Sequence, residues 1–226
     1  MPARQHPGDQ IPLRPALPIA ALLISAALLS GCAGDSWAQP HAPTAVGTLG
    51  PGFVPSSPPS PEATFAPAAE SWSAVHPSPG YRVVLLTAGD DAPTRAIVTA
   101  VRDWAREERA DLRTVESVDH IEGIVEAMEM NPDLIVSAGN DLIDPLATVT
   151  ASHLDQHFLV IGAEVPEPTL NVTAVDWSGA SFRGEGVNAA SVYDPATFTA
   201  ERCASAVRAG VAAVLNDLTG VVLWID

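Results

Sequence analysis

The sequence predicts an α/β domain over residues 81–226, built on a doubly wound, mostly parallel sheet with helices on both faces. Three observations predict it. Apolar runs of strand length alternate with stretches whose apolar residues recur at helical spacing. The first run, at 82–87, has the composition of a buried strand. The connections between them are short, which is typical of repeated strand–helix–strand units.

The predicted strands follow from these apolar runs. The first, at 82–87, ends in a Gly turn, and the later ones alternate with helical segments. Residues 184–199 interrupt the alternation as a loop containing Gly, Asn, Ser and Pro. The strands are expected at 82–87, 111–116, 134–137, 157–162, 171–176 and 221–225.

Four helices are predicted between these strands. The first carries an apolar stripe that includes Ile97 and Trp104, with Asp90 or Asp91 as its N-cap and Pro93 in its first turn. In the second, Asp119 and Glu122 form a capping box. Its inward stripe is expected to be Ile121, Ile124, Val125 and Met128. The third and fourth helices are expected at about 141–152 and 200–218.

The N-terminus predicts a bacterial lipoprotein signal peptide over residues 1–31. Residues 15–29 form an apolar run of signal-peptide length, shorter than the roughly 20 residues of a membrane span. Leu29-Ser30-Gly31-Cys32 follows and resembles a lipobox. That resemblance implies cleavage before Cys32, a diacylglyceryl group on its thiol, and fatty acyl chains such as palmitate. An uncleaved signal anchor and a plain secretory signal are the alternatives.

Residues 32–80 are predicted to be the lipidated Cys followed by a disordered tether. Residues 33–80 contain ten Pro and only three charged residues, and no apolar period persists through them. A flexible coil of this length would reach roughly 40 Å on average. A Pro-rich docking ligand is the alternative, but no P-x-x-P cluster with basic flanks is present.

The composition excludes several classes of partner. The formal net charge is −16, and all 11 basic residues are Arg. Nucleic-acid binding needs clustered basic charge, so we expect no nucleic-acid partner. Two cysteines cannot build a disulfide framework. We therefore expect Cys203 to be a buried, unpaired thiol on the last helix, with a reactive thiol as the alternative.

Parallel α/β sheets bind ligands at the carboxyl ends of their strands, where the polar loops of this domain are expected to gather. Carboxylates there can accept from hydroxyl or amino groups, helix N-termini can receive anions, and Trp177 could stack on a ring. Asp91 and Asn140 could instead be helix caps alone. The expected ligand-binding residues are Asp90, Asp91, Gly139, Asn140, Asp176 and Trp177.

Three stretches together resemble the basic membrane protein family. They are the Gly89-Asp90-Asp91 turn, the Pro132-to-Gly139 stretch, and Asn171-Val172 followed by Phe182-Arg183-Gly184-Glu185-Gly186. The family comprises substrate-binding lipoproteins of nucleoside-type ABC importers with the type I periplasmic-binding-protein fold. The resemblance implies a single, first lobe of that fold over 81–226, a small solute such as a nucleoside, and an ABC permease as partner. A homodimer could replace the second lobe.

No motif indicates catalysis. The chain lacks a G-x-S-x-G elbow, a P-loop, and a G-x-G-x-x-G after the first strand. His153 and His157 are four residues apart without a metalloprotease Glu between them. We therefore expect no enzyme activity, no metal and no cofactor.

These observations together predict a solute-binding-like protein held by lipid on the extracytoplasmic face of the cell membrane. The alternative is a protein-interaction or structural module of the cell envelope that binds no small molecule.

Overall fold

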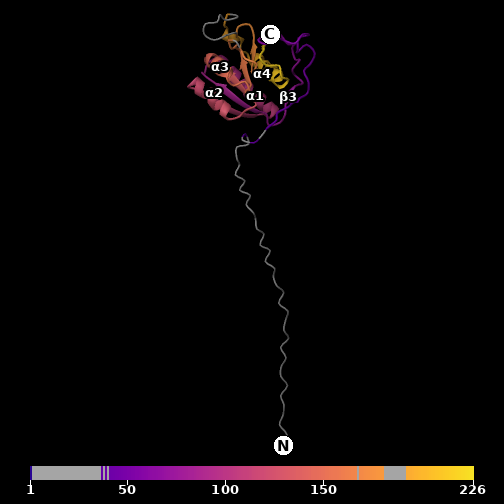
Figure 1. Ribbon diagram of the computed structural model, residues 1–226, viewed down its shortest axis with the longest axis vertical. Helices are drawn as coiled ribbons and strands as arrows, with labels where there is room; N and C mark the ends of the chain where they lie inside the picture. The colour runs from indigo at the N-terminus through magenta and orange to yellow at the C-terminus, as the bar shows by residue number, and fades with distance from the viewer. Residues whose placement is uncertain (2–36, 38, 40, 167, 181–191) are drawn as a thin grey trace. The chain divides into compact units, whose positions relative to one another are not determined.

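The computed structural model describes residue 1, residues 37 and 39, and residues 41–166, 168–180 and 192–226. A seven-stranded, fully parallel sheet lies at its centre, in the order β2-β9-β8-β7-β6-β4-β5 (Figure 1). The predicted α/β class is therefore confirmed. The strands are β2 (Thr64–Phe65), β4 (Arg82–Thr87), β5 (Asp111–Glu116), β6 (Leu134–Ala138), β7 (Phe158–Ile161), β8 (Val172–Asp176) and β9 (Val222–Trp224).

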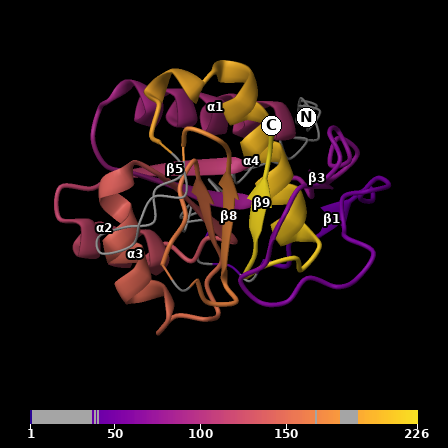
Figure 2. The same ribbon diagram turned by 90° about the horizontal axis from the view of Figure 1, so that it is seen from above.

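Two pairs of helices cover the two faces of the sheet. Helices α1 (Ala92–Glu108) and α4 (Ala200–Leu215) pack together, and α2 (His120–Glu129) packs with α3 (Ile143–Thr150) (Figure 2). Alternate residues of each strand enter different apolar clusters. In β4, Val83 and Leu85 join the α1/α4 side, and Val84 and Leu86 join the α2/α3 side. This alternation makes the sheet doubly wound, as predicted.

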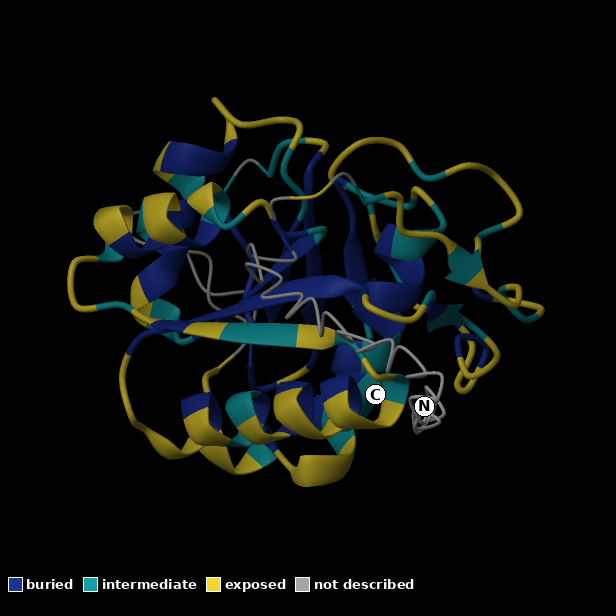
Figure 3. Cartoon of the chain, turned by 90° about the horizontal axis from the view of Figure 1, so that it is seen from below, coloured by how far each residue is buried: buried dark blue, intermediate teal, exposed yellow. Residues whose placement is uncertain are grey.

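The helix starts follow the local sequence. Asp91 and Asp119 are the N-caps of α1 and α2, as their positions predict. Trp104 in α1 and Ile124 in α2 are buried. In Figure 3 the helices turn dark blue sides to the sheet and yellow sides to solvent. Helix α4 ends at Leu215, three residues before the predicted end.

Helix α2 departs from the predicted apolar stripe. Ile121 and Val125 are exposed, and the buried positions are Gly123, Ile124 and Ala127. A Cβ at Gly123 would lie 2.4 Å from the Ser117 hydroxyl oxygen, so the helix approaches the preceding loop along its glycine side. The small residues face inward because this close approach leaves no room for larger ones.

The N-terminal segment, residues 37, 39 and 41–80, corrects the predicted tether. Phe53 and Trp72 are buried and meet edge to face, with ring centroids 6.4 Å apart. β2 pairs with β9 at the end of the sheet, and β1 (Ala45–Val46) pairs antiparallel with β3 (His76–Pro77). The ordered domain therefore begins well before residue 81, because aromatic side chains anchor a Pro-rich chain that has no helical or strand periodicity.

The predicted signal peptide, apart from residue 1, the predicted lipidation site Cys32, and the first half of the 184–199 loop lie outside the described residues. The described end of that loop, 192–199, contains the short 3₁₀ turn η3 (Pro195–Thr197). No helix within the described ranges combines the length and the apolarity that crossing a membrane requires.

Candidate functional site

The seven-stranded sheet has a topological switch point between β4 and β6, where the strand order reverses direction. The order β7-β6-β4-β5 places β4 between β5 and β6, so the chain turns to opposite sides of β4. A crevice outside the carboxyl ends of β4 and β6 is where doubly wound sheets hold their ligands. Asp90 and Asp91 follow β4, and Gly139 and Asn140 follow β6, so four predicted site residues lie at the carboxyl ends of these two strands.

Asp91 is occupied by the helix that it starts. Its Oδ1 accepts the backbone N–H of Thr94 at 3.1 Å, and its Oδ2 accepts the Thr94 hydroxyl at 2.6 Å. Both carboxylate oxygens therefore have partners within α1. The capping role that the sequence left open as an alternative accounts for this side chain.

Gly139 lets the turns after β4 and β6 touch. Its φ of 122° is open to glycine alone, and a Cβ there would lie 2.2 Å from the carbonyl oxygen of Ala88. Asn140 follows half-buried, at the start of the short turn η2 (Asn140–Leu142). Gly139 is thus a requirement of the fold at this edge.

Asp176 and Trp177, at the end of β8, are fully buried. Asp176 accepts the backbone N–H of Trp177 at 2.8 Å, and the Trp177 indole N–H donates to the Thr197 hydroxyl at 3.1 Å. The Trp177 ring meets Phe198 edge to face, with centroids 4.9 Å apart. The stacking of Trp177 on a ligand ring stays a prediction; in this structure Phe198 packs against the indole, which is 1% exposed.

Tyr193 and Phe198 occupy the switch-point crevice. Together with Asp91, Thr94 and Asn140 they line a cavity of only about 10 Å³, room for roughly one water molecule. Burial and the charge of Asp91 raise the pKa of the Tyr193 hydroxyl. The sequence reasoning missed both aromatics, although two rings in an otherwise polar loop were a signal that the loop folds back onto the domain.

An open hollow of about 440 Å³ lies beside this crevice, at the carboxyl ends of β4 and β5. It is the size of a small-molecule site. Carboxylates and guanidinium groups share its wall, and Arg95 donates to the carbonyl oxygen of Asp90. Of the predicted site residues, only Asp90 lines it. The charged and hydroxyl-bearing residues of the lining are Thr87, Asp90, Thr94, Arg95, Thr99, Arg102, Glu116 and Ser117.

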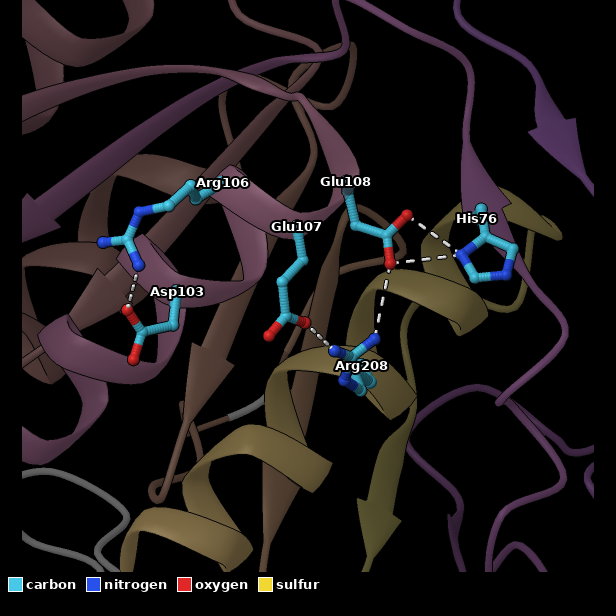
Figure 4. A network of polar contacts seen from close by, with 6 residues as sticks. All are labelled: His76, Asp103, Arg106, Glu107, Glu108 and Arg208. Carbon is cyan, nitrogen blue, oxygen red and sulfur yellow. Dashed lines mark hydrogen bonds and ion pairs between the residues drawn. The ribbon is translucent and has the colours of Figure 1, made fainter.

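A second groove, of about 420 Å³, runs between α1 and α4. Trp104, Ala100 and Ala204 contribute apolar surface to it, and Arg208 stands at its rim. Arg208 crosses from α4 to α1, where it pairs with Glu107 and, at 3.3 Å, with Glu108 (Figure 4). This ion-pair network holds the two helices together.

Glu108 also ties the N-terminal segment to the same network. Its carboxylate lies 2.9 Å from Nδ1 of His76, in β3 (Figure 4). Glu108 is largely buried, which strengthens its pairings relative to those of the exposed Asp103–Arg106 pair in α1. The network is therefore a structural joint between α1, α4 and β3.

The described residues offer little for metal or thiol chemistry. Across the described ranges, no three His, Cys, Asp or Glu side chains gather closely enough to hold a metal ion. Cys203 is a free, fully buried thiol on the inner side of α4, and burial raises its pKa to about 11. The thiol is therefore protonated at neutral pH, the form that is unreactive as a nucleophile.

Comparison with known proteins gives distant likenesses only. No family model matches the sequence, and no curated protein matches it significantly. Two ABC-transporter solute-binding proteins of solved structure are similar over 43% of this chain. One, from Aeropyrum pernix K1, is 20% identical with a TM-score of 0.38, and the other, from Conexibacter woesei DSM 14684, is 17% identical with a TM-score of 0.36.

This chain spans only 29% and 35% of the length of those two proteins. A fragment described as a lipoprotein from Peptoclostridium difficile 630 is 20% identical over 61% of this chain and 99% of the fragment, with a TM-score of 0.42. Because all these TM-scores are below 0.5, the fold assignment rests on the strand order and register of the chain itself.

Proposed function

We propose that this chain is a lipid-anchored, extracytoplasmic, non-enzymatic protein that binds a small polar solute. The lipobox at Cys32 supports the anchor. The observation that carries solute binding is the open hollow at the carboxyl ends of β4 and β5, where doubly wound sheets present their ligand-binding loops. Two of the structurally similar proteins are themselves solute-binding proteins, the class that we propose here.

The chemistry of the hollow selects the class of solute. Asp90 and Glu116 bring carboxylates to its lining, and Arg95 and Arg102 bring guanidinium groups. A small zwitterion or polyol can pair with both kinds of group. No aromatic residue lines the hollow within the described ranges, so a nucleoside would lack the stacking partner that its base prefers. We therefore propose an amino-acid-like or sugar-like solute in place of the nucleoside that the family resemblance implies.

A second candidate is an interaction module of the cell envelope. The observation that favours it is the filled switch-point crevice, where Tyr193 and Phe198 take the place of a ligand. In this version the carboxyl edge of the sheet binds another protein of the cell envelope or a second copy of the chain. A permease gene and an ATPase gene beside the gene for this chain would support solute capture.

Thermal unfolding tests the first proposal against the second. The chain from residue 33 onward is screened with amino acids, sugars and nucleosides. A ligand that binds the folded state alone, at a hundredfold excess over its dissociation constant, stabilises that state by about 2.7 kcal/mol. We expect a shift with one of the first two classes. A response to nucleosides alone would contradict the proposed solute class.

The same assay locates the site. In the double variant D90N/E116Q both carboxylates of the hollow lose their charge, and we expect the ligand-induced shift to disappear. The matched control is E126Q/E129Q, which makes the same change of charge on the exposed side of α2. Equal shifts in both variants would place the solute elsewhere, and a flat screen with the unaltered chain would favour the interaction module.

A further inference from the structure

The first described residue of the N-terminal segment, Trp37, is bound at the amino ends of the strands, the amino edge of the sheet. The Trp37 indole N–H donates to Oδ2 of Asp111, the first residue of β5, at 2.8 Å. The Arg113 guanidinium lies 4.1 Å from the centroid of the Trp37 ring. Arg82, the first residue of β4, donates to the backbone carbonyl oxygens of Trp37 and Gln39 at 3.1 and 3.0 Å.

The next described residue continues along the same edge. His41 places its Nε2 3.1 Å from the carboxylate of Asp133, directly before β6. The chain is therefore held beside the amino ends of three neighbouring strands, β5, β4 and β6. Trp37 is almost completely buried in this position, which makes it a firm point of attachment.

Only four residues separate Cys32 from Trp37. Five Cα-to-Cα steps of a fully extended chain span about 18 Å at most. A strand of six residues such as β5 is itself roughly 20 Å long. The lipid that the proposed function places on Cys32 is therefore tied to Trp37 by a connection shorter than β5. The short connection replaces the 40 Å tether that composition predicts.

Two exposed leucines stand on this same edge. Leu154 and Leu170, on the loops before β7 and β8, are 59% and 63% exposed. The two loops are tied together, because the Asn171 side-chain amide donates to the carbonyl oxygens of His153 and Gln156 at 2.9 and 3.0 Å. With strands about 4.8 Å apart, β8 lies roughly 19 Å from β5 along the edge, so both leucines lie on the same edge of the sheet as the attachment of Trp37.

We propose that the amino edge of the sheet rests on the lipid bilayer, with Leu154 and Leu170 in contact with its interface. The carboxyl edge and its hollow then face away from the membrane. This inference rests on the acylation of Cys32 in the proposed function. The formal net charge of −16 gives no attraction to anionic lipid, so the acyl chains and the leucines supply the contact, and added salt does not weaken it.

Fluorescence quenching by spin-labelled lipid tests the orientation. The full-length chain is produced in a lipoprotein-processing bacterial host, labelled at one introduced cysteine and placed in phosphatidylcholine vesicles that contain nitroxide lipid. L154C and L170C probe the amino edge. V118C, at a fully exposed position after β5, is the control at the carboxyl edge. Buried Cys203 and acylated Cys32 leave the introduced thiol as the site of labelling.

We expect quenching at positions 154 and 170 to exceed quenching at 118 at least threefold, in low and in high salt. Insertion of 20 Gly/Ser residues between Gly34 and Asp35, which span roughly 25 Å on average, should bring the three positions close to equality. Equal quenching in the uninserted chain, or stronger quenching at 118, would overturn the orientation. The mass of the N-terminal peptide reports acylation separately: a chain without acyl groups would overturn the anchor and the orientation together.

Discussion

The Trp177 ring packs edge to face against Phe198, with centroids 4.9 Å apart, at the carboxyl edge of the sheet, the edge at which doubly wound sheets bind ligands. Phe198 comes from the segment that precedes α4, and it closes the crevice together with Tyr193. The chain thus supplies its own side chains to a place that other proteins of this architecture leave to a ligand. Solute binding, if it follows our proposal, is displaced toward β5.

Phe198→Ala should destabilise the domain by about 3–5 kcal/mol, because it removes a buried ring and leaves a cavity beside Trp177. Chemical denaturation followed by tryptophan fluorescence measures the free energy of unfolding. Tyr193→Ala is the matched comparison, since that side chain is 41% exposed and should cost much less. Similar losses in the two variants would contradict the buried position of Phe198.

The N-terminal segment makes a second prediction. Phe53→Ala should cost about 3–5 kcal/mol of unfolding free energy, because Phe53 is fully buried against Trp72. Val54→Ala, at an exposed neighbouring position, should change it by no more than about 0.5 kcal/mol. Both values come from urea titration. A neutral Phe53→Ala would mean that the segment behaves as the tether that its composition predicts.

The sequence predicts the central strands of the domain well, because a strand that is buried on both faces has a continuous apolar sequence. β4 is apolar through its centre and buried throughout, and its observed bounds coincide with the predicted ones. The bounds of β5 also coincide, although only Val115 of this edge strand is buried. The caps Asp91 and Asp119 were predictable for an equally local reason, since a carboxylate before a helix accepts N–H groups two or three residues on. Contacts between residues that are far apart in the chain produce no such local pattern in the sequence.

The failures of sequence reasoning are therefore long-range ones. Phe53 and Trp72 sit in a Pro-rich stretch without any period, and only the folded domain shows what they pack against. Trp177 is exposed or enclosed depending on Phe198, which lies 21 residues further along the chain. For the same reason the sequence identified Asp90 but not Glu116 or Arg102, which reach the hollow from a neighbouring strand and from the third turn of α1.

Gly139 gives a prediction about the contact between the β4 and β6 turns. In Gly139→Ala the new methyl group would overlap the Ala88 carbonyl oxygen, at a backbone φ of 122°. Gly80→Ala is the control, with a positive φ of 80° and open space around the new group. In the control the free energy of unfolding should fall by about 1–2 kcal/mol, because alanine is less favourable than glycine in a left-handed backbone conformation. Gly139→Ala should lower the free energy of unfolding by about 1–3 kcal/mol more than the control does, which is the typical cost of overpacking.

Thermal denaturation of the two glycine variants, measured side by side, compares a Cβ in open space at Gly80 with one that meets the Ala88 carbonyl oxygen at Gly139. The extra loss at Gly139 contains both the overlap and the cost of its φ of 122° and ψ of 131°. Equal melting temperatures would show that the two turns do not approach each other as closely as the Ala88 contact requires.

Cys203 predicts a specific dependence of stability on pH. Burial raises its pKa in the folded chain to about 11, whereas the unfolded thiol titrates near its ordinary value of about 8.5. The folded state therefore holds the proton more tightly. This contribution to stability is complete below the unfolded pKa and is lost as pH rises through the interval up to 11, with a limiting slope of about 1.4 kcal/mol per pH unit.

Urea titrations of the Cys32→Ser chain between pH 8 and 11 measure this loss, and Cys203→Ala in the same background removes the contribution of the thiol. Buried Tyr81, whose pKa is raised by burial and by the charge of Asp133, adds a slope that both chains share. We expect the difference between the two slopes to isolate Cys203. A thiol reagent at pH 8 should leave the folded Cys32→Ser chain unlabelled and react fully in urea; rapid labelling of the folded chain would contradict the burial of Cys203.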